Sequence, residues 1–199
     1  MILITVFFIV LIINILPAFA PPTWVVLAFT AFYYDFNNSS LISLAFLVAL
    51  AATLGRLILA TFSKRIVRTR FLSEKTRMNL DEAKNKLKDK NFFTSTVFFL
   101  YAISPLPSGQ FFLAYGLTDL SINIAAIPFF LGRFLSYMVW AFGSSKISDK
   151  VNIENLNASN FFGYSFIISQ LFALILVYLF VKINWHKLIF EKKITFIKS

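Results

Sequence analysis

The chain has no cysteine and only one histidine, His186, among its 199 residues. The absence of cysteine excludes disulfides, thiol catalysis and thiolate metal ligands. A lone histidine beside Trp185 and Lys187 is a poor metal ligand, and no nucleophile-base pair is recognisable elsewhere. The sequence therefore predicts no catalytic residues, no metal and no cofactor, and the chain is not expected to be an enzyme.

Charged residues are also scarce, at 14% against 58% hydrophobic residues, and the mean hydropathy is +0.76. Long uncharged runs such as Leu41 to Leu54 and Phe161 to Val181 suit a hydrocarbon core about 30 Å thick, which about 20 helical residues cross. The net charge of +10 lies next to these runs, where anionic headgroups explain it better than nucleic acid does. These features predict an all-α, polytopic integral membrane protein that binds no nucleic acid.

Prolines are few, and three of the six interrupt an apolar stretch near the start of the chain. Residues 1–16 are apolar, Pro17, Pro21 and Pro22 follow, and the next apolar stretch, Thr23 to Tyr34, spans only about 18 Å as a helix. Because proline removes a backbone donor and clashes one turn back, no helix continues through this loop. We expect a re-entrant hairpin of two half-helices.

The second half of the chain repeats this plan. Phe92 to Ser104 is apolar, a loop with Pro105 and Pro107 interrupts it, and Gln110 to Leu117 is short and apolar. Each hairpin precedes a long apolar segment that contains a glycine-arginine pair, and such repeats of broken helices are typical of transporters. The two pairs are Gly55-Arg56 and Gly132-Arg133.

We therefore divide one membrane domain, residues 1–199, into six segments. They are a first repeat (1–62), a basic linker (63–91), a second repeat (92–142), an outer loop (143–160), a last transmembrane helix (161–181) and a basic tail (182–199). About three full spans are expected, near 41–62, 121–142 and 161–181.

The basic linker sets the expected orientation. Residues 64–90 contain ten Lys or Arg against four Asp or Glu, so the positive-inside rule places this loop and the basic tail in the cytoplasm of a multi-pass cell-membrane protein. The first hairpin then enters from outside and the second from the cytoplasm, an inverted arrangement. Asn79 followed by Glu82 predicts the start of an amphipathic helix, although a plain solvated linker fits equally well.

The arginines of the two pairs are the main candidates for a binding site. Arg56 lies about 9 Å from the cytoplasmic end of its span, within snorkelling reach, so it is either an interface anchor or functional. Arg133 is too deep to snorkel and is expected to face a polar cavity or to cap carbonyls of the broken loop. With the backbone amides at Ser108, Gly109 and Gln110 it can hold a phosphate, unless this loop is only a kink satisfied by its neighbours.

The stretch from Ser104 to Thr118 (SPLPSGQFFLAYGLT), continued by Ile127 to Tyr137 (IPFFLGRFLSY), resembles the DedA superfamily, also called VTT or SNARE-associated domain proteins. It is closest to the branch that contains vacuole membrane protein one, and the resemblance covers about residues 10–180. It implies two opposed re-entrant hairpins and movement of lipids between leaflets. Bacterial members carry an acid beside the first proline loop and two arginines around the second. Here the loop 17–22 has no acid, and Ala102 and Ser108 stand at the arginine positions.

The sequence thus leads to a hypothesis of lipid translocation, in which the groove between two re-entrant loops lets a headgroup cross the bilayer. The expected partners are membrane lipids, either phospholipid or polyprenyl phosphate. The sequence leaves open whether the chain forms a homo-oligomer. An ion-coupled exporter of small solutes is the first alternative, but it requires an intramembrane carboxylate and the predicted spans contain none. A membrane scaffold that acts through the basic linker is the second.

Overall fold

The structure is a computed structural model that describes residues 1–88, 91–103, 108–148 and 164–184, together with 187, 191, 193, 195 and 196 in the tail. Within this part of the chain every regular element is a helix, and the pairing between Ile183 and Phe196 is an isolated bridge. Two of the described helices are long and apolar enough to cross a membrane, Asn38–Phe71 and Asn123–Lys146. The prediction of an all-helical fold is confirmed.

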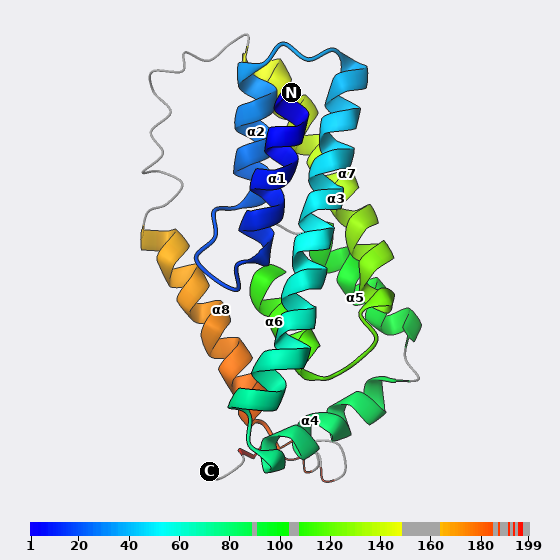
Figure 1. Ribbon diagram of the computed structural model, residues 1–199, viewed down its shortest axis with the longest axis vertical. Helices are drawn as coiled ribbons and strands as arrows, with labels where there is room; N and C mark the ends of the chain where they lie inside the picture. Colours follow the sequence, from blue (N-terminus) through cyan, green and yellow to red (C-terminus); the bar gives the residue numbers. More distant parts are fainter. Residues whose placement is uncertain are drawn as a thin grey trace.

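The first repeat consists of two short helices and one long one (Figure 1). α1 spans Ile2–Ile15, α2 spans Thr23–Tyr33 and α3 spans Asn38–Phe62. α1 ends just before Pro17, as expected from proline chemistry. The side chain of Asn14 holds the hairpin together, because its Nδ2 donates to the Thr23 hydroxyl at 2.9 Å. Asn37 caps α3 by accepting the Ser40 amide at 2.8 Å.

The second repeat has the same three-part order. α5 spans Asn91–Ile103, α6 spans Ser108–Leu117 and α7 spans Asn123–Ser148. The predicted start of the second half-helix at Ser108 is confirmed. Pro105 and Pro107, which the sequence assigns to the intervening loop, lie outside the described residues.

The two repeats interlock in opposite directions. α3 and α7 run antiparallel through the molecule, with α1 and α2 beside their upper halves and α5 and α6 beside their lower halves in Figure 1. α1 packs on α3 as α5 packs on α7, whereas α2 crosses to α7 and α6 crosses to α3. One apolar core joins α1, α2, α3 and α7, and a second joins α3, α5, α6 and α7. The helix pairings of the two halves thus follow a pseudo-twofold pattern.

Glycines permit the closest helix contacts in both repeats. A Cβ atom at Gly55 would lie 2.6 Å from the Cβ of Asn14, and one at Gly132 would lie 2.7 Å from the Cβ of Ala102. Side chains do not tolerate such separations, so only glycine lets these backbones approach. The two glycines therefore occupy equivalent places, each on a long helix against the end of the first half-helix of its own repeat.

The basic linker is helical rather than a plain solvated loop. α3 continues as a π-helical stretch, Ser63–Phe71, and α4 spans Glu74–Leu87. The predicted start at Asn79 is wrong, because the cap is Ser73, whose side chain accepts the Thr76 amide at 3.3 Å. Asn79 lies inside α4, where its Nδ2 donates to the carbonyl of Ile183 at 2.7 Å.

The last helix, α8, spans Tyr164–Lys182 and packs against α6. Its 19 residues are about 28 Å long, and their apolar part, Gln170–Lys182, is shorter than a full span. Most of the predicted outer loop 143–160 and the tail around His186 lie outside the described residues.

Candidate functional site

Arg56 lies in the C-terminal half of α3 and is only 7% exposed. Its Nη1 donates to the carbonyls of Asn14 at 2.9 Å and Leu16 at 3.1 Å, and its Nε donates to the hydroxyl of Ser108 at 3.0 Å. Both carbonyls belong to the C-terminal end of α1, where the helix leaves its last acceptors unpaired and its dipole favours a cation. Arg56 therefore ties the first loop to the start of α6.

Gly109 brings the first loop and α6 into direct contact. A Cβ atom at this position would lie 2.7 Å from the carbonyl oxygen of Pro17 and 2.9 Å from Nη1 of Arg56. Only glycine fits between these groups. The first proline loop and the start of the second half-helix thus meet at Arg56, and no described residue accepts a hydrogen bond from its remaining nitrogen, Nη2.

Arg133 is the second buried guanidinium, also 7% exposed. Its Cζ lies 5.3 Å from the ring centre of Phe129 and 5.7 Å from that of Tyr137, one helical turn before and after it on α7. Cation-π contacts of this kind contribute about 0.5–2 kcal/mol each, more where water is excluded. The guanidinium is close enough to Arg56 for the two charges to repel each other.

Two buried glutamines join the site to α8. Gln110 Nε2 donates to Gln170 Oε1 at 2.7 Å, and the same oxygen accepts the backbone amide of Phe19 at 3.4 Å. The side-chain oxygen of Gln110 is buried and has no partner among the described residues. A buried acceptor without a donor costs about 1–3 kcal/mol, so this oxygen is well suited to accept a hydrogen bond from a ligand or a water molecule.

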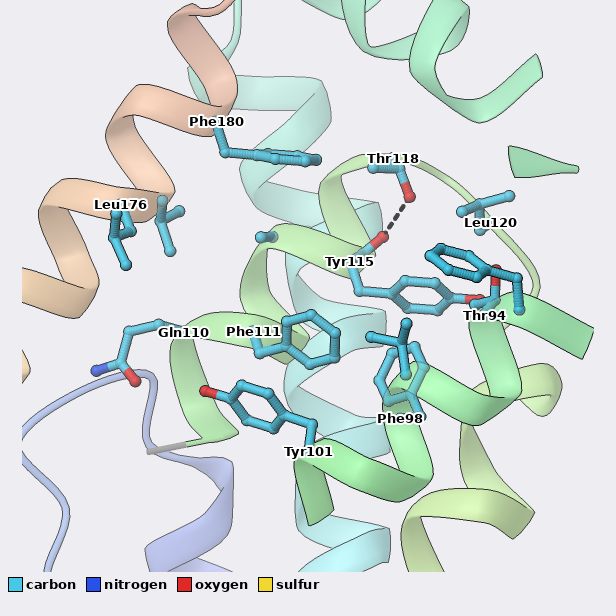
Figure 2. Close-up of a pocket in the computed structure, with 14 residues that line it drawn as sticks. Thr94, Phe98, Tyr101, Gln110, Phe111, Tyr115, Thr118, Leu120, Leu176 and Phe180 are labelled. Atoms are coloured by element: carbon cyan, nitrogen blue, oxygen red, sulfur yellow. Dashed lines mark hydrogen bonds between the residues drawn. The ribbon is translucent and has the colours of Figure 1, made fainter. Parts of the chain in front are cut away.

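A cavity of about 390 Å³ lies between α5, α6 and α8 (Figure 2). Aromatic and aliphatic side chains form most of its wall, and none of the described residues that line it is charged. Tyr101 and Gln110 are its polar groups nearest to the arginines, because Gln110 follows Gly109 in α6 and Tyr101 lies within electrostatic range of both guanidiniums. The cavity therefore lies next to the arginine site.

A separate polar cluster joins the far ends of α3, α4 and α6. Asp119, at the turn after α6, pairs with Lys64 at 2.7 Å and with Lys84 at 2.6 Å. Partial burial alone would raise the pKa of Asp119, but hydrogen bonds and charge from the two lysines lower it below its ordinary value. Arg68 donates to the carbonyl of Leu117 and to Asp81, both at 2.7 Å. These contacts fix α4 against the fold.

The structure brings the predicted residues Arg56, Ser108, Gly109 and Gln110 into one buried cluster, with Arg133 within electrostatic range of Arg56. Sequence reasoning missed Asn14, Gln170 and Tyr101. Asn14 and Gln170 were recognisable as amides inside apolar segments, where an unsatisfied polar side chain is costly. Tyr101 gave no such signal, because its ring is ordinary in an aromatic-rich helix.

No family model, no curated protein and no solved structure matches this chain.

Proposed function

We propose that this chain is a polytopic membrane protein that lowers the barrier for a phosphate-bearing lipid headgroup to cross the bilayer. The headgroup site is the cluster where the first loop meets the start of α6. The observation that carries this proposal is the pair of buried arginines, Arg56 and Arg133, in long helices whose sequences contain no acidic residue. Two nearby positive charges with no acidic residue in their helices favour the binding of an anion.

The lengths of the short helices support a re-entrant arrangement. α1 and α2 have 14 and 11 residues, and α5 and α6 have 13 and 10, so each spans about 15–21 Å, less than a hydrocarbon core of about 30 Å. Both hairpins therefore turn back inside the bilayer, from opposite sides. Broken helices are tolerated at that depth only where they are buried in protein or line a polar cavity, which is the setting around Arg56.

The surface supports a lipid environment. Ile127, Leu131, Leu135 and Val139 form a stripe along α7, with 46–73% of each residue exposed. Soluble monomers rarely expose contiguous apolar patches of this kind, whereas hydrocarbon tails cover them at no cost. On this basis we place three helices, α3, α7 and α8, across the membrane, with the basic linker on the cytoplasmic side. Membership of the DedA superfamily is part of the same proposal.

In the proposed mechanism the protein replaces headgroup water with fixed dipoles and charges. Nη2 of Arg56, the guanidinium of Arg133 and the amides at the start of α6 offer donors to phosphate oxygens, and the oxygen of Gln110 accepts from a headgroup hydroxyl or amine. Arg56 stays anchored by its three hydrogen bonds, so the site needs little reorganisation when a headgroup enters.

The test is a liposome assay with fluorescent phospholipid that is quenched in one leaflet, without an ion gradient. We expect the wild type to scramble lipid and Arg133→Gln to slow it about tenfold or more, because a hydrogen bond to a charged group contributes about 1.5–3 kcal/mol. Arg70→Gln, at an exposed arginine of the basic linker, is the matched control and is expected to leave the rate unchanged. A wild type no faster than empty liposomes contradicts the proposal and favours a scaffold that acts through residues 64–90.

A further inference from the structure

The cavity between α5, α6 and α8 has walls suited to hydrocarbon. Its aromatic lining includes Phe98, Phe111 and Phe180, and its aliphatic lining includes Val97 and Leu176 (Figure 2). Its volume of about 390 Å³ falls within the range of about 300–1,000 Å³ that is usual for ligand pockets. An occupant without charge therefore fits it best.

Two polar groups at the end away from the arginines are already hydrogen-bonded inside the protein. The hydroxyl of Tyr115 donates to the carbonyl of Ser121 at 2.8 Å. The hydroxyl of Thr118 donates to the carbonyl of Tyr115 at 2.7 Å (Figure 2). Thr94 is the one remaining polar side chain among the described residues that line this end (Figure 2), so an occupant meets little polar surface there. At the other end the unpaired oxygen of Gln110 marks the junction with the arginine site. The cavity is thus polar where it meets the site and mostly apolar beyond it.

We propose that this cavity holds one hydrocarbon chain of the lipid whose phosphate is bound at Arg56 and Arg133. This inference rests on the proposed function and specifies the substrate as a phosphate-headed lipid, either a phospholipid or a polyprenyl phosphate. The headgroup lies at the junction of the loops, one chain extends between α5, α6 and α8, and any second chain stays in the bilayer. The protein therefore binds the lipid by both ends during crossing.

The experiment is photocrosslinking of the purified protein in detergent with two probes that carry a diazirine at the chain end. One is a phosphatidylglycerol and the other a polyprenyl phosphate, and peptide mass spectrometry locates the label. We expect label on α5, α6 or α8 at cavity-lining residues with at least one probe, and the two arms identify the lipid class. A diacylglycerol with the same diazirine, which has no phosphate, should label the cavity less.

A filling variant and a matched control make the test specific. Val97→Phe occupies the cavity and is expected to lower cavity labelling about tenfold, because each excluded methylene costs about fourfold in affinity. Val139→Phe makes the same change on the exposed face of α7, where 73% of Val139 is accessible, and should label as the wild type does. If Val97→Phe does not fold, Ala114→Leu fills the same cavity from α6.

Labelling requires no transport, so the two proposals fail separately. Cavity labelling that the filling variant abolishes supports the chain site even if the liposome assay is negative. A wild type that scrambles lipid but is labelled only on exposed surfaces, or a Val97→Phe protein labelled like the wild type, overturns the chain site and leaves the proposed function standing.

Discussion

At the scale of single residues, the contacts of Arg56 require the shape of a guanidinium. Its planar fork donates to two carbonyls of the first loop and to the hydroxyl of Ser108, so one side chain joins both repeats. Removing it leaves the buried carbonyl of Asn14 and the partly buried carbonyl of Leu16 without their donor, and a buried group in that state costs about 1–3 kcal/mol.

We therefore expect Arg56→Met to lower the free energy of unfolding in detergent by about 2 kcal/mol or more. Arg56→Lys should fall between Arg56→Met and the wild type, because an ammonium keeps the charge but not the fork. Arg65→Met, at an exposed arginine, is the control and should stay within about 0.5 kcal/mol. Thermal unfolding followed by tryptophan fluorescence measures all three. Equal loss in Arg56→Met and Arg65→Met would contradict the bridging role.

The sequence was sufficient to select Arg56 and Arg133, because a charge in an apolar segment must have a reason. It was not sufficient to find their surroundings. The bonds from Arg56 to Asn14 and to Ser108 connect residues 42 and 52 positions apart, and the bond between Gln110 and Gln170 connects residues 60 apart. No local periodicity encodes such contacts, so the assembled site required the tertiary structure.

At the scale of helices, local sequence signals predicted some helix ends and missed others. Proline and length placed the ends of α1, α2 and α5 to within about two residues, because a proline stops a helix by itself. The start of α4 was misplaced at Asn79. Two weak capping signals compete there, and the structure uses Ser73, whose hydroxyl accepts the amide three residues on.

Helix contact at the glycines leads to a second prediction. Gly55→Ala and Gly132→Ala should each destabilise the fold by about 1–3 kcal/mol, because the added Cβ meets backbone and side chain of α1 or α5 at 2.6–2.7 Å. Gly143→Ala is the control, since a Cβ there meets nothing within 4 Å, and it should be neutral or stabilising by up to about 1 kcal/mol. The free energies of unfolding of the three variants, measured in one detergent, test this prediction. A destabilised Gly143→Ala beside an unaffected Gly55→Ala would refute this packing.

The ion pairs of Asp119 lead to a third prediction, about how α4 is fixed. Since Lys64 and Lys84 lower the pKa of Asp119, its carboxylate stabilises the fold above the unfolded pKa near about 4, and the effect is lost as pH falls through the folded value. Both pairs are partly exposed, so the gain should be below about 1 kcal/mol.

The test compares unfolding of the wild type with Asp119→Asn at pH 6 and pH 3. Asparagine tolerates the positive φ of 58° at this position, so only the charge changes. The difference in stability between the two proteins should be present at pH 6 and smaller at pH 3, and about 1 M salt should reduce it at pH 6. A difference that persists unchanged at pH 3 would show that the ion pairs are not its cause.

At the scale of the whole molecule, the proposed inverted topology can be tested at the two ends of the fold. Residue 39, at the start of α3, and residue 85, in α4, lie at opposite ends of the molecule in Figure 1. The cysteine-free chain permits single-cysteine labelling without background. We expect Ser39→Cys to react with an impermeant maleimide in intact cells, and Asn85→Cys to react only after permeabilisation, because the basic linker is assigned to the cytoplasm.

The hairpin loop gives the deciding position. Phe19 is 52% exposed. Because α1 is only about 21 Å long, the loop at Phe19 does not reach the far side of the bilayer if α1 enters from the side of Ser39. Phe19→Cys should therefore react more slowly than either exposed cysteine, from both sides. Rapid reaction from the side of Asn85 would mean that α1 and α2 cross the bilayer completely. The meeting of the loops at Arg56 would then lie at a membrane surface, where two buried arginines no longer imply an intramembrane anion site.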